Sequence, residues 1–174
     1  MRSKIILLII LGFTICGVTG QNPTATSKST LVTKGQIVPA FKFEISKGKT
    51  VSIGDYKGKI VLINFFATWC GPCRREMPLY QEKIWNRHKD NPKFALLAFG
   101  REHMWDEVLK FGKDMGLTFP LLPDPKRNVY GKFATELIPR SILLDQDGKI
   151  LYLSEGFEEP HFNELKDLID NLLN

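Results

Sequence analysis

The sequence predicts an α/β protein with a mixed central β-sheet flanked by helices. Two stretches, KIVLINFF at 59–66 and KFALLAFG at 93–100, are almost continuously apolar, which suits strands covered on both faces. Near the end, Asp147-Gly148 lies between two apolar runs and is a strong hairpin signal. Amphipathic helical patterns separate these strands, and this order is typical of a mixed sheet packed against helices.

An early β-hairpin is expected before the first buried strand. Apolar and polar residues alternate at 41–45 and again at 51–53, around a turn at 47–49. This pattern predicts edge strands with one side facing solvent.

The first long helix is expected from Cys73 to about His88. It should bend at Pro78, because proline lacks an N–H donor and clashes with the preceding turn. The remaining elements expected from pattern are a helix at 104–115, a return to the sheet at 119–125, a short helix near 128–135 and a last helix opening at Pro160.

The chain length of 174 residues suits one domain with an N-terminal appendage. Residues 1–20 are predicted to be an export signal, with Arg2 and Lys4 before an apolar run and a small-residue cleavage site at its end. Two alternatives attach the protein to a membrane: a retained anchor, or lipidation at Cys16. Residues 21–34 are rich in Ser and Thr and are expected to form a flexible linker, so the globular domain is placed at 35–174.

The charge pattern disfavours nucleic acid as a partner. Loss of the signal removes two basic residues and lowers the formal net charge from +5 to +3. No basic run beyond a doublet is present in the sequence, so we expect a mixed-charge, solvated surface and a monomer.

Cleavage of the signal would leave Cys70 and Cys73 as the only thiols. A bridge between them closes too small a loop to be an effective structural staple. Half of a zinc site and an inert buried pair are both disfavoured, since there is no second CxxC and the three histidines lack paired spacing. No metal site is predicted.

The placement of the two cysteines favours redox chemistry. Cys70 would follow a buried strand at the start of a helix, where free N–H groups and the helix dipole stabilise a thiolate. Cys70 is therefore the expected nucleophile, and the more buried Cys73 the resolving thiol. Gly71 lets a partner's backbone approach, and Pro72 fixes the turn.

The segment FFATWCGPCRREMP at 65–78 resembles the active-site segment of the thioredoxin superfamily, in particular its exported TlpA/ResA-like branch. The similarity covers about 35–174 and includes GLTFPLLPDP at 116–125 and IPRSILLDQDGKI at 138–150. It implies a thioredoxin fold with an N-terminal β-hairpin and a central insertion around 104–115. It also implies a redox-active Cys70–Cys73 disulfide.

The resemblance further implies a substrate-binding surface formed by Trp69, Gly71, Pro72, Ile138 and Pro139, and Arg140 is a further candidate beside it. In this family the bond before the proline is cis and lies against the cysteines; from the sequence alone, an ordinary trans proline at the start of a strand is the alternative. Arg140 stands where many relatives have a small Thr. It would either place a charge beside the substrate or point outward along the strand.

Two polar positions near the cysteines bear on proton transfer. Asn64 occupies the place of the buried Asp of cytosolic-type thioredoxins and cannot take up a proton. Glu76 lies three residues after Cys73, on the same side of the helix. We expect a raised pKa and a role in proton transfer to and from the thiols; an exposed first-turn Glu favoured by the helix dipole is the alternative.

The direction of electron flow is expected to be reductive. Gly-Pro between the cysteines lacks the histidine with which strong oxidases stabilise their thiolate. The predicted protein is an exported, periplasmic or extracytoplasmic thiol-disulfide oxidoreductase that acts on protein disulfides. Resemblance implies a membrane thiol-disulfide electron donor and substrates that include apocytochrome c thiols, as in cytochrome c biogenesis.

No cofactor is expected, because no G-x-G-x-x-G follows a strand. Alternatives are a peroxiredoxin-related thiol peroxidase, a disulfide oxidase or isomerase, and a thiol-based metal carrier that would bind copper through the cysteines and a distant His such as His103.

Overall fold

The computed structural model describes residues 27–174. The predicted signal at 1–20 and residues 21–26 of the predicted linker lie outside the described residues. Within 27–174, no helix is both long and apolar enough to cross a membrane.

The elements follow one another in the predicted order, with helices between the strands. They are β1 (Lys42–Ser46), β2 (Lys49–Ser52), η1 (Ile53–Tyr56), β3 (Ile60–Phe66), α1 (Gly71–Leu79), η2 (Tyr80–Trp85), α2 (Asn86–His88), β4 (Phe94–Arg101), α3 (Trp105–Met115), β5 (Leu121–Asp124), η3 (Tyr130–Lys132), β6 (Arg140–Leu144), β7 (Ile150–Glu155) and α4 (Glu159–Leu173).

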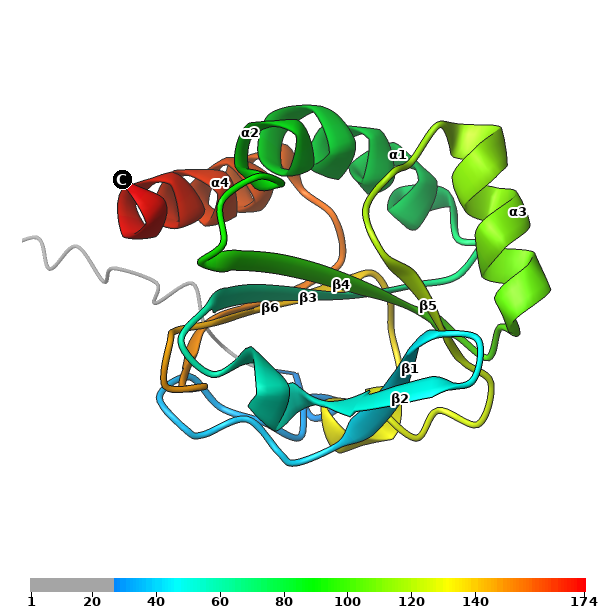
Figure 1. Cartoon of the computed structure of the whole chain (residues 1–174), viewed down its shortest axis with the longest axis horizontal. Coiled ribbons are helices and arrows are strands. Elements are labelled where there is room, and N and C mark those ends of the chain that lie inside the picture. The colour runs from blue at the N-terminus through cyan, green and yellow to red at the C-terminus, as the bar shows by residue number, and fades with distance from the viewer. Residues whose placement is uncertain (1–26) are drawn as a thin grey trace, which may run out of the picture.

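The central sheet has five strands in the order β5-β4-β3-β6-β7 (Figure 1). Strands β3, β4 and β5 run parallel, whereas β6 is antiparallel to β3 and to β7. The sheet is therefore mixed, as predicted. Helix α3 and strand β5 are inserted between β4 and β6, which agrees with the expected central insertion.

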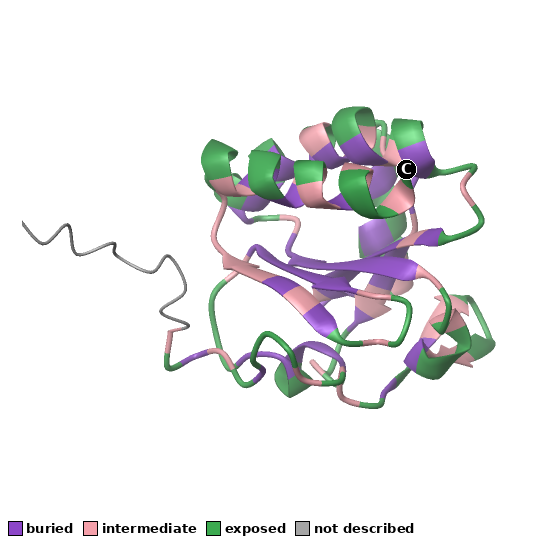
Figure 2. Ribbon diagram, turned by 90° about the vertical axis from the view of Figure 1, so that its left-hand side faces the viewer, coloured by how far each residue is buried: buried purple, intermediate pink, exposed green. Residues whose placement is uncertain are grey.

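Each face of the sheet has its own apolar core, because side chains alternate along a strand. In β3, Leu62 and Phe66 belong to the core beneath α1, α3 and α4, whereas Ile63 and Phe65 belong to the opposite core. We call these the helix-side core and the hairpin-side core. Figure 1 shows the helices above the sheet and the β1–β2 hairpin below it, and Figure 2 shows the buried sheet between these two layers.

The predicted N-terminal hairpin is present, and both of its strands are edge strands, as expected. Within residues 27–174, strands β1 and β2 pair with each other alone, as a separate two-stranded sheet. Phe41 and Phe43 are buried, and the ring of Phe43 packs edge-on against Phe99 of β4 at 5.2 Å between centroids. The hairpin therefore buries its apolar side against the face of the central sheet.

The first helix begins at Gly71, with Cys70 as its N-cap, two residues before the predicted start. The predicted irregularity at Pro78 is present. Pro78 removes one hydrogen-bond donor inside α1, and the helix continues from Tyr80 as the wider, π-helical segment η2.

Residues 27–34 differ from the expected flexible linker. Thr30 forms a β-bridge with Ala134, and Val32, only 2% exposed, lies in the hairpin-side core. The polar composition of this stretch suggested a solvated tether, yet its serines and threonines find partners inside the domain. The packed structure begins at least eight residues before the predicted domain boundary.

Candidate active site

The two cysteines lie just beyond the carboxyl end of the central strand β3. They form a disulfide with Cα atoms 5.3 Å apart, and the backbone N–H of Cys73 donates to the Cys70 sulfur at 3.2 Å. Cys70 is the N-cap of α1 and is 5% exposed, whereas Cys73 is 0% exposed. Of the two sulfurs, that of Cys70 belongs to the more accessible residue and receives the helix N–H.

An exposed rim surrounds Cys70. Trp69 is 65% exposed, and Gly71 and Pro72 are also exposed. The guanidinium of Arg101 lies 5.7 Å from the centre of the Trp69 ring, a cation–π arrangement that supports the indole from one side. This surface is open to a partner molecule.

A loop from the start of β6 forms the other side of the site. The Ile138–Pro139 bond is cis, as the family resemblance implied. The carbonyl oxygen of Ile138 lies 3.9 Å from the Cys70 sulfur. Leu137, just before this pair, is 50% exposed. The loop thus presents backbone groups and an apolar side chain beside the reactive sulfur.

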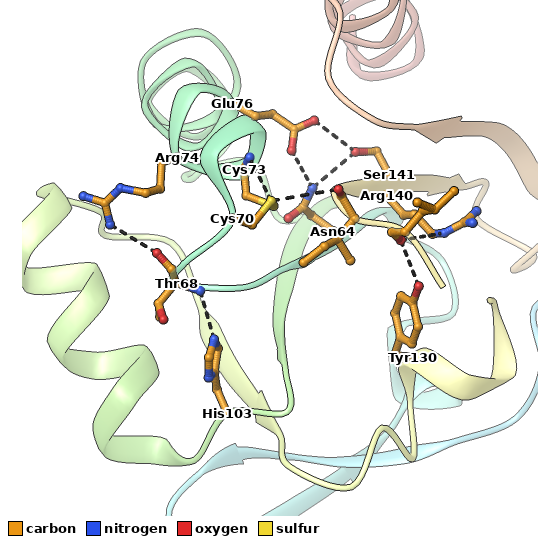
Figure 3. The surroundings of a disulfide bond; sticks show 12 residues. Asn64, Thr68, Cys70, Cys73, Arg74, Glu76, His103, Tyr130, Arg140 and Ser141 are labelled. Carbon is orange, nitrogen blue, oxygen red and sulfur yellow. Dashed lines mark hydrogen bonds between the residues drawn. A yellow bond between two sulfur atoms is a disulfide. The ribbon is translucent and has the colours of Figure 1, made fainter. Parts of the chain in front are cut away.

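Glu76 is buried beneath the cysteines, so the alternative of an exposed first-turn glutamate is wrong. It is 3% exposed, and its carboxylate accepts hydrogen bonds from Asn64 Nδ2 and Tyr80 Oη, each at 3.0 Å. Figure 3 shows the hydrogen bond from Asn64. Burial raises the pKa of Glu76 to about 7, although hydrogen bonds from Tyr80, Asn64 and Ser141 lower it. The expected direction of the pKa shift is confirmed.

The hydroxyls of Tyr80 and Ser141 lie 2.5 Å apart and join Glu76 in one buried polar group. Figure 3 shows Ser141 beside Glu76 and Asn64. Burial, and the charge of Glu76, raise the pKa of Tyr80 well above its usual value, so its hydroxyl keeps its proton. Asn64 lies in the same group, where its amide donates to Glu76 and Ser141. Its other amide atom, Oδ1, is buried and has no hydrogen-bond donor among the described residues.

Arg140 occupies neither of its two predicted positions. It is 3% exposed, so it does not point outward into solvent, and its guanidinium contacts Ser29, Thr30 and Glu155 rather than the cysteines. The reason is strand alternation: Ser141 faces the helix side and reaches Glu76, so its neighbour Arg140 faces the hairpin side. Figure 3 shows Arg140 pointing away from the disulfide.

Two residues that the sequence did not place at the site also support it. His103 accepts a hydrogen bond on Nε2 from the backbone N–H of Thr68, 2.9 Å away, and so holds the segment that leads into Cys70. Tyr130 donates from its hydroxyl to the carbonyl of Leu137 at 2.8 Å (Figure 3). His103 stood out only as a distant metal ligand, and no local pattern marks Tyr130, because both contacts join separate segments.

His103 lies near the cysteines, but its Nε2 is already used by the backbone. In residues 27–174, no group of three or more His, Cys, Asp or Glu side chains is placed to hold a metal ion.

The relation to known proteins agrees with this geometry. Residues 33–169 match the Redoxin family. The chain belongs to the Redoxin family. Among its relatives is the thiol-disulfide oxidoreductase ResA of Geobacillus thermodenitrificans, which is 32% identical over 158 residues, or 90% of this chain and 86% of the relative. The thioredoxin-like protein YneN of Bacillus subtilis is 37% identical over 159 residues, covering 88% of each chain.

Several solved structures share the fold of this chain. A Bacteroides thetaiotaomicron protein solved in solution is 37% identical, with a TM-score of 0.79 over 83% of this chain and 92% of its own. The thioredoxin domain of a thiol-disulfide oxidoreductase from Bacteroides vulgatus is 25% identical, with a TM-score of 0.68 over 82% and 99% of the chains. The predicted superfamily and thioredoxin fold are confirmed, and the predicted enzyme class is that of these relatives.

Proposed function

We propose that this protein is an exported protein-disulfide reductase that works through the Cys70–Cys73 couple. Its class, thiol-disulfide oxidoreductase, is that of its named relatives. The observation that carries the proposal is the position of Cys70: its sulfur caps α1, lies 3.9 Å from the Ile138 carbonyl and adjoins an exposed rim.

The reaction uses two exchanges. In the reduced enzyme, the Cys70 thiolate attacks one sulfur of a substrate disulfide; a Cys70–substrate disulfide forms, and the other substrate sulfur leaves and takes a proton. The Cys73 thiolate then attacks the Cys70 sulfur. The Cys70–Cys73 disulfide forms, the second substrate thiol is released, and two electrons have passed from enzyme to substrate.

The helix start favours Cys70 as the attacking thiol. The Cys73 N–H already donates to the Cys70 sulfur in the oxidised form, and the positive end of the α1 dipole stabilises a thiolate there. Cys73 is buried and so is shielded from other disulfides. It lies one helical turn after Cys70, within reach of the sulfur that it must attack.

Glu76 is proposed to exchange a proton with the thiols. Attack by Cys73 requires loss of its proton, and Cys73 is fully buried. Glu76 lies one helical turn from Cys73 and has a pKa of about 7, which lets it both accept and return a proton near neutral pH.

The direction of electron flow, the electron donor, the location and the substrates are proposed from the sequence and from its family resemblance. The Gly71-Pro72 dipeptide lacks a group that would stabilise the reduced state strongly, which favours a reductant. A reductase outside the cytoplasm needs an electron source, which we propose to be a membrane thiol-disulfide donor. An export signal at 1–20, cleaved or retained as a tether, and apocytochrome c among the substrates belong to the same proposal.

Trapping tests the mechanism. Cys73→Ser should accumulate mixed disulfides with protein partners, because Cys70 still attacks but nothing resolves the intermediate. The measurement is non-reducing electrophoresis with mass spectrometry of the linked peptides, and Cys70→Ser is the matched control that should trap none.

Equilibration with glutathione or dithiothreitol buffers measures the reduction potential, which tests the proposed direction of electron flow. We expect a reduction potential near that of thioredoxin, about −270 mV, and far below the value of about −120 mV that marks a strong oxidase. A potential near the oxidase value, with no trapped partner, would refute the reductase function.

A further inference from the structure

We propose that Arg140 is a positioning residue that, with Ser29, Thr30 and Glu155, holds the substrate-facing loop 136–139 in its working geometry. We call these four residues the Arg140 clamp. The inference rests on the proposed disulfide-exchange function and adds a determinant of polypeptide recognition on the hairpin side of the sheet.

The guanidinium of Arg140 binds the loop directly. Nε donates to the carbonyl oxygens of Glu136 and Leu137 at 3.2 and 3.0 Å, and Nη2 donates to the Glu136 carbonyl at 2.8 Å. Two successive carbonyls just before the cis bond are thereby fixed by one planar cation.

The other side of the guanidinium is fixed by the N-terminal segment and β7. Nη1 donates to the Thr30 hydroxyl at 2.7 Å, and Nη2 donates to the Ser29 hydroxyl. Glu155 pairs with Nη2 at 2.8 Å and supplies the opposite charge. A buried cation with this many partners has little freedom to move, so it is a rigid support.

The N-terminal segment is itself attached to the loop by its backbone. The N–H of Thr135 donates to the carbonyl of Ser29 at 2.9 Å, and the Ser27 hydroxyl donates to the Glu155 carboxylate at 2.6 Å. Residues 27–30 thus connect the chain just before the loop with the anion that pairs with Arg140.

The loop needs such support because its backbone is strained. Leu137 has φ 71°, a left-handed conformation that residues other than glycine rarely adopt. Its carbonyl accepts from both Arg140 Nε and the Tyr130 hydroxyl. With that carbonyl fixed, the next one, on Ile138, lies beside the Cys70 sulfur, where a bound polypeptide would pass.

The position of the clamp separates recognition from chemistry. Arg140 lies on the hairpin side of the sheet, whereas the group around Glu76 lies on the helix side. Loss of the clamp should therefore displace the loop, with its Ile138 carbonyl, while the two cysteines keep their positions at the start of α1. Binding of an extended polypeptide should suffer, while exchange with a small disulfide should continue.

The test compares two substrates across Arg140 variants of the full chain. For Arg140→Gln we expect KM for insulin reduction to rise about fivefold to tenfold, because a misplaced loop weakens binding of the extended chain. The rate with 5,5′-dithiobis(2-nitrobenzoic acid) should stay within twofold of the wild-type rate. The reduction potential should equal the wild-type value within error. Arg140→Lys keeps the charge opposite Glu155 and should recover part of the loss.

Milder variants keep the test valid if Arg140→Gln fails to fold. Thr30→Val removes one acceptor and leaves the ion pair intact, so KM for insulin should rise about twofold to threefold. The control is Lys132→Gln, which removes a positive charge from the exposed surface of η3. It should change neither KM for insulin nor the rate with the small disulfide.

Three results would have distinct meanings. Folded Arg140→Gln and Thr30→Val proteins with an unchanged KM for insulin would overturn the clamp. Equal losses with both substrates, together with a shifted potential, would also overturn it, because Arg140 would then act through the thiols or the whole fold. A wild-type protein that reduces neither substrate would instead refute the proposed function.

Discussion

Glu76 shows how one buried carboxyl links the chemistry of the site to the stability of the protein. Burial raises its pKa from 4.5 to about 7, so the native state holds the proton more tightly than the unfolded chain does. Between these two pH values the Glu76 carboxyl is ionised in the unfolded chain but still largely protonated in the native state. The free energy of unfolding contributed by this group is therefore complete below pH 4.5 and is lost as pH rises through about 7.

Glu76→Gln should remove this pH dependence, because the amide does not titrate. The wild-type free energy of unfolding should fall by about 3 kcal/mol across the window through this group, and the variant should lack that slope. Urea unfolding at several pH values measures this effect. In the reduced protein, the rate of alkylation at Cys70 should also no longer change with the titration of Glu76 near neutral pH.

The control is Glu82→Gln; the Glu82 side chain is 65% exposed and pairs with the neighbouring Lys83. It should keep both wild-type profiles. An alkylation profile of Glu76→Gln that superimposes on the wild type would leave Glu76 without a role in proton transfer.

Single residues were predictable from the sequence where local spacing decides their place. Cys70 and Cys73 are defined by the strand-to-helix pattern, and Glu76 follows them by one helical turn. Arg140 was misplaced because its side depends on the register of β6: one step along the strand moves a side chain to the other core. The hydroxyl of Tyr130 reaches Leu137 through a loop whose path no local pattern specifies.

At the scale of elements, the connection between β5 and η3 depends on one buried carboxylate. Asp124, 3% exposed, accepts from the backbone N–H groups of Val129 and Tyr130 at 3.1 and 2.8 Å. These bonds begin the short helix that carries the Tyr130 hydroxyl to the substrate-facing loop. Asp124 therefore supports the site through the element that it caps.

Asp124→Ala should lower the free energy of unfolding by about 2–4 kcal/mol, because it leaves two buried N–H groups without acceptors. Asp114→Ala removes an ion pair with Lys110 at a position that is 52% exposed, and should cost less than about 1 kcal/mol. Chemical denaturation of both variants measures the difference. Equal losses would mean that Asp124 does not cap the connection.

Most elements could be predicted because their patterns are local. The two continuous apolar strands, the hairpin at Asp147-Gly148 and the helix ending at Gly116 need only neighbouring residues to be recognised. The location of the β1–β2 hairpin was not predictable in the same way. Phe41 and Phe43 show that one side is apolar, but not whether that side meets a face of the sheet or continues its edge.

At the scale of the whole molecule, the core on one side of the sheet extends to residues before the predicted domain boundary at 35. The hairpin-side core includes Val32, contributed by a segment whose composition suggested a linker. Composition failed here because one buried apolar residue and a few satisfied hydroxyls are enough to attach a short polar stretch.

Val32→Ala should lower the free energy of unfolding by about 2 kcal/mol, since two buried carbons are lost and a small cavity is left. Leu31→Ala, at a neighbouring position that is 52% exposed, should change it by less than about 0.5 kcal/mol. Thermal and urea unfolding of the two variants provide the comparison. If Val32→Ala were as mild as its neighbour, the segment would not belong to the cooperative unit.

The separation of the two cores by the sheet has an evolutionary consequence. The groups that would move electrons and protons are on the helix side, whereas Arg140, Ser29 and Thr30 are on the hairpin side. Substitutions on the hairpin side can alter which partners are accepted while the reactive groups stay unchanged. A lineage can in this way diversify its partners while it inherits one redox centre.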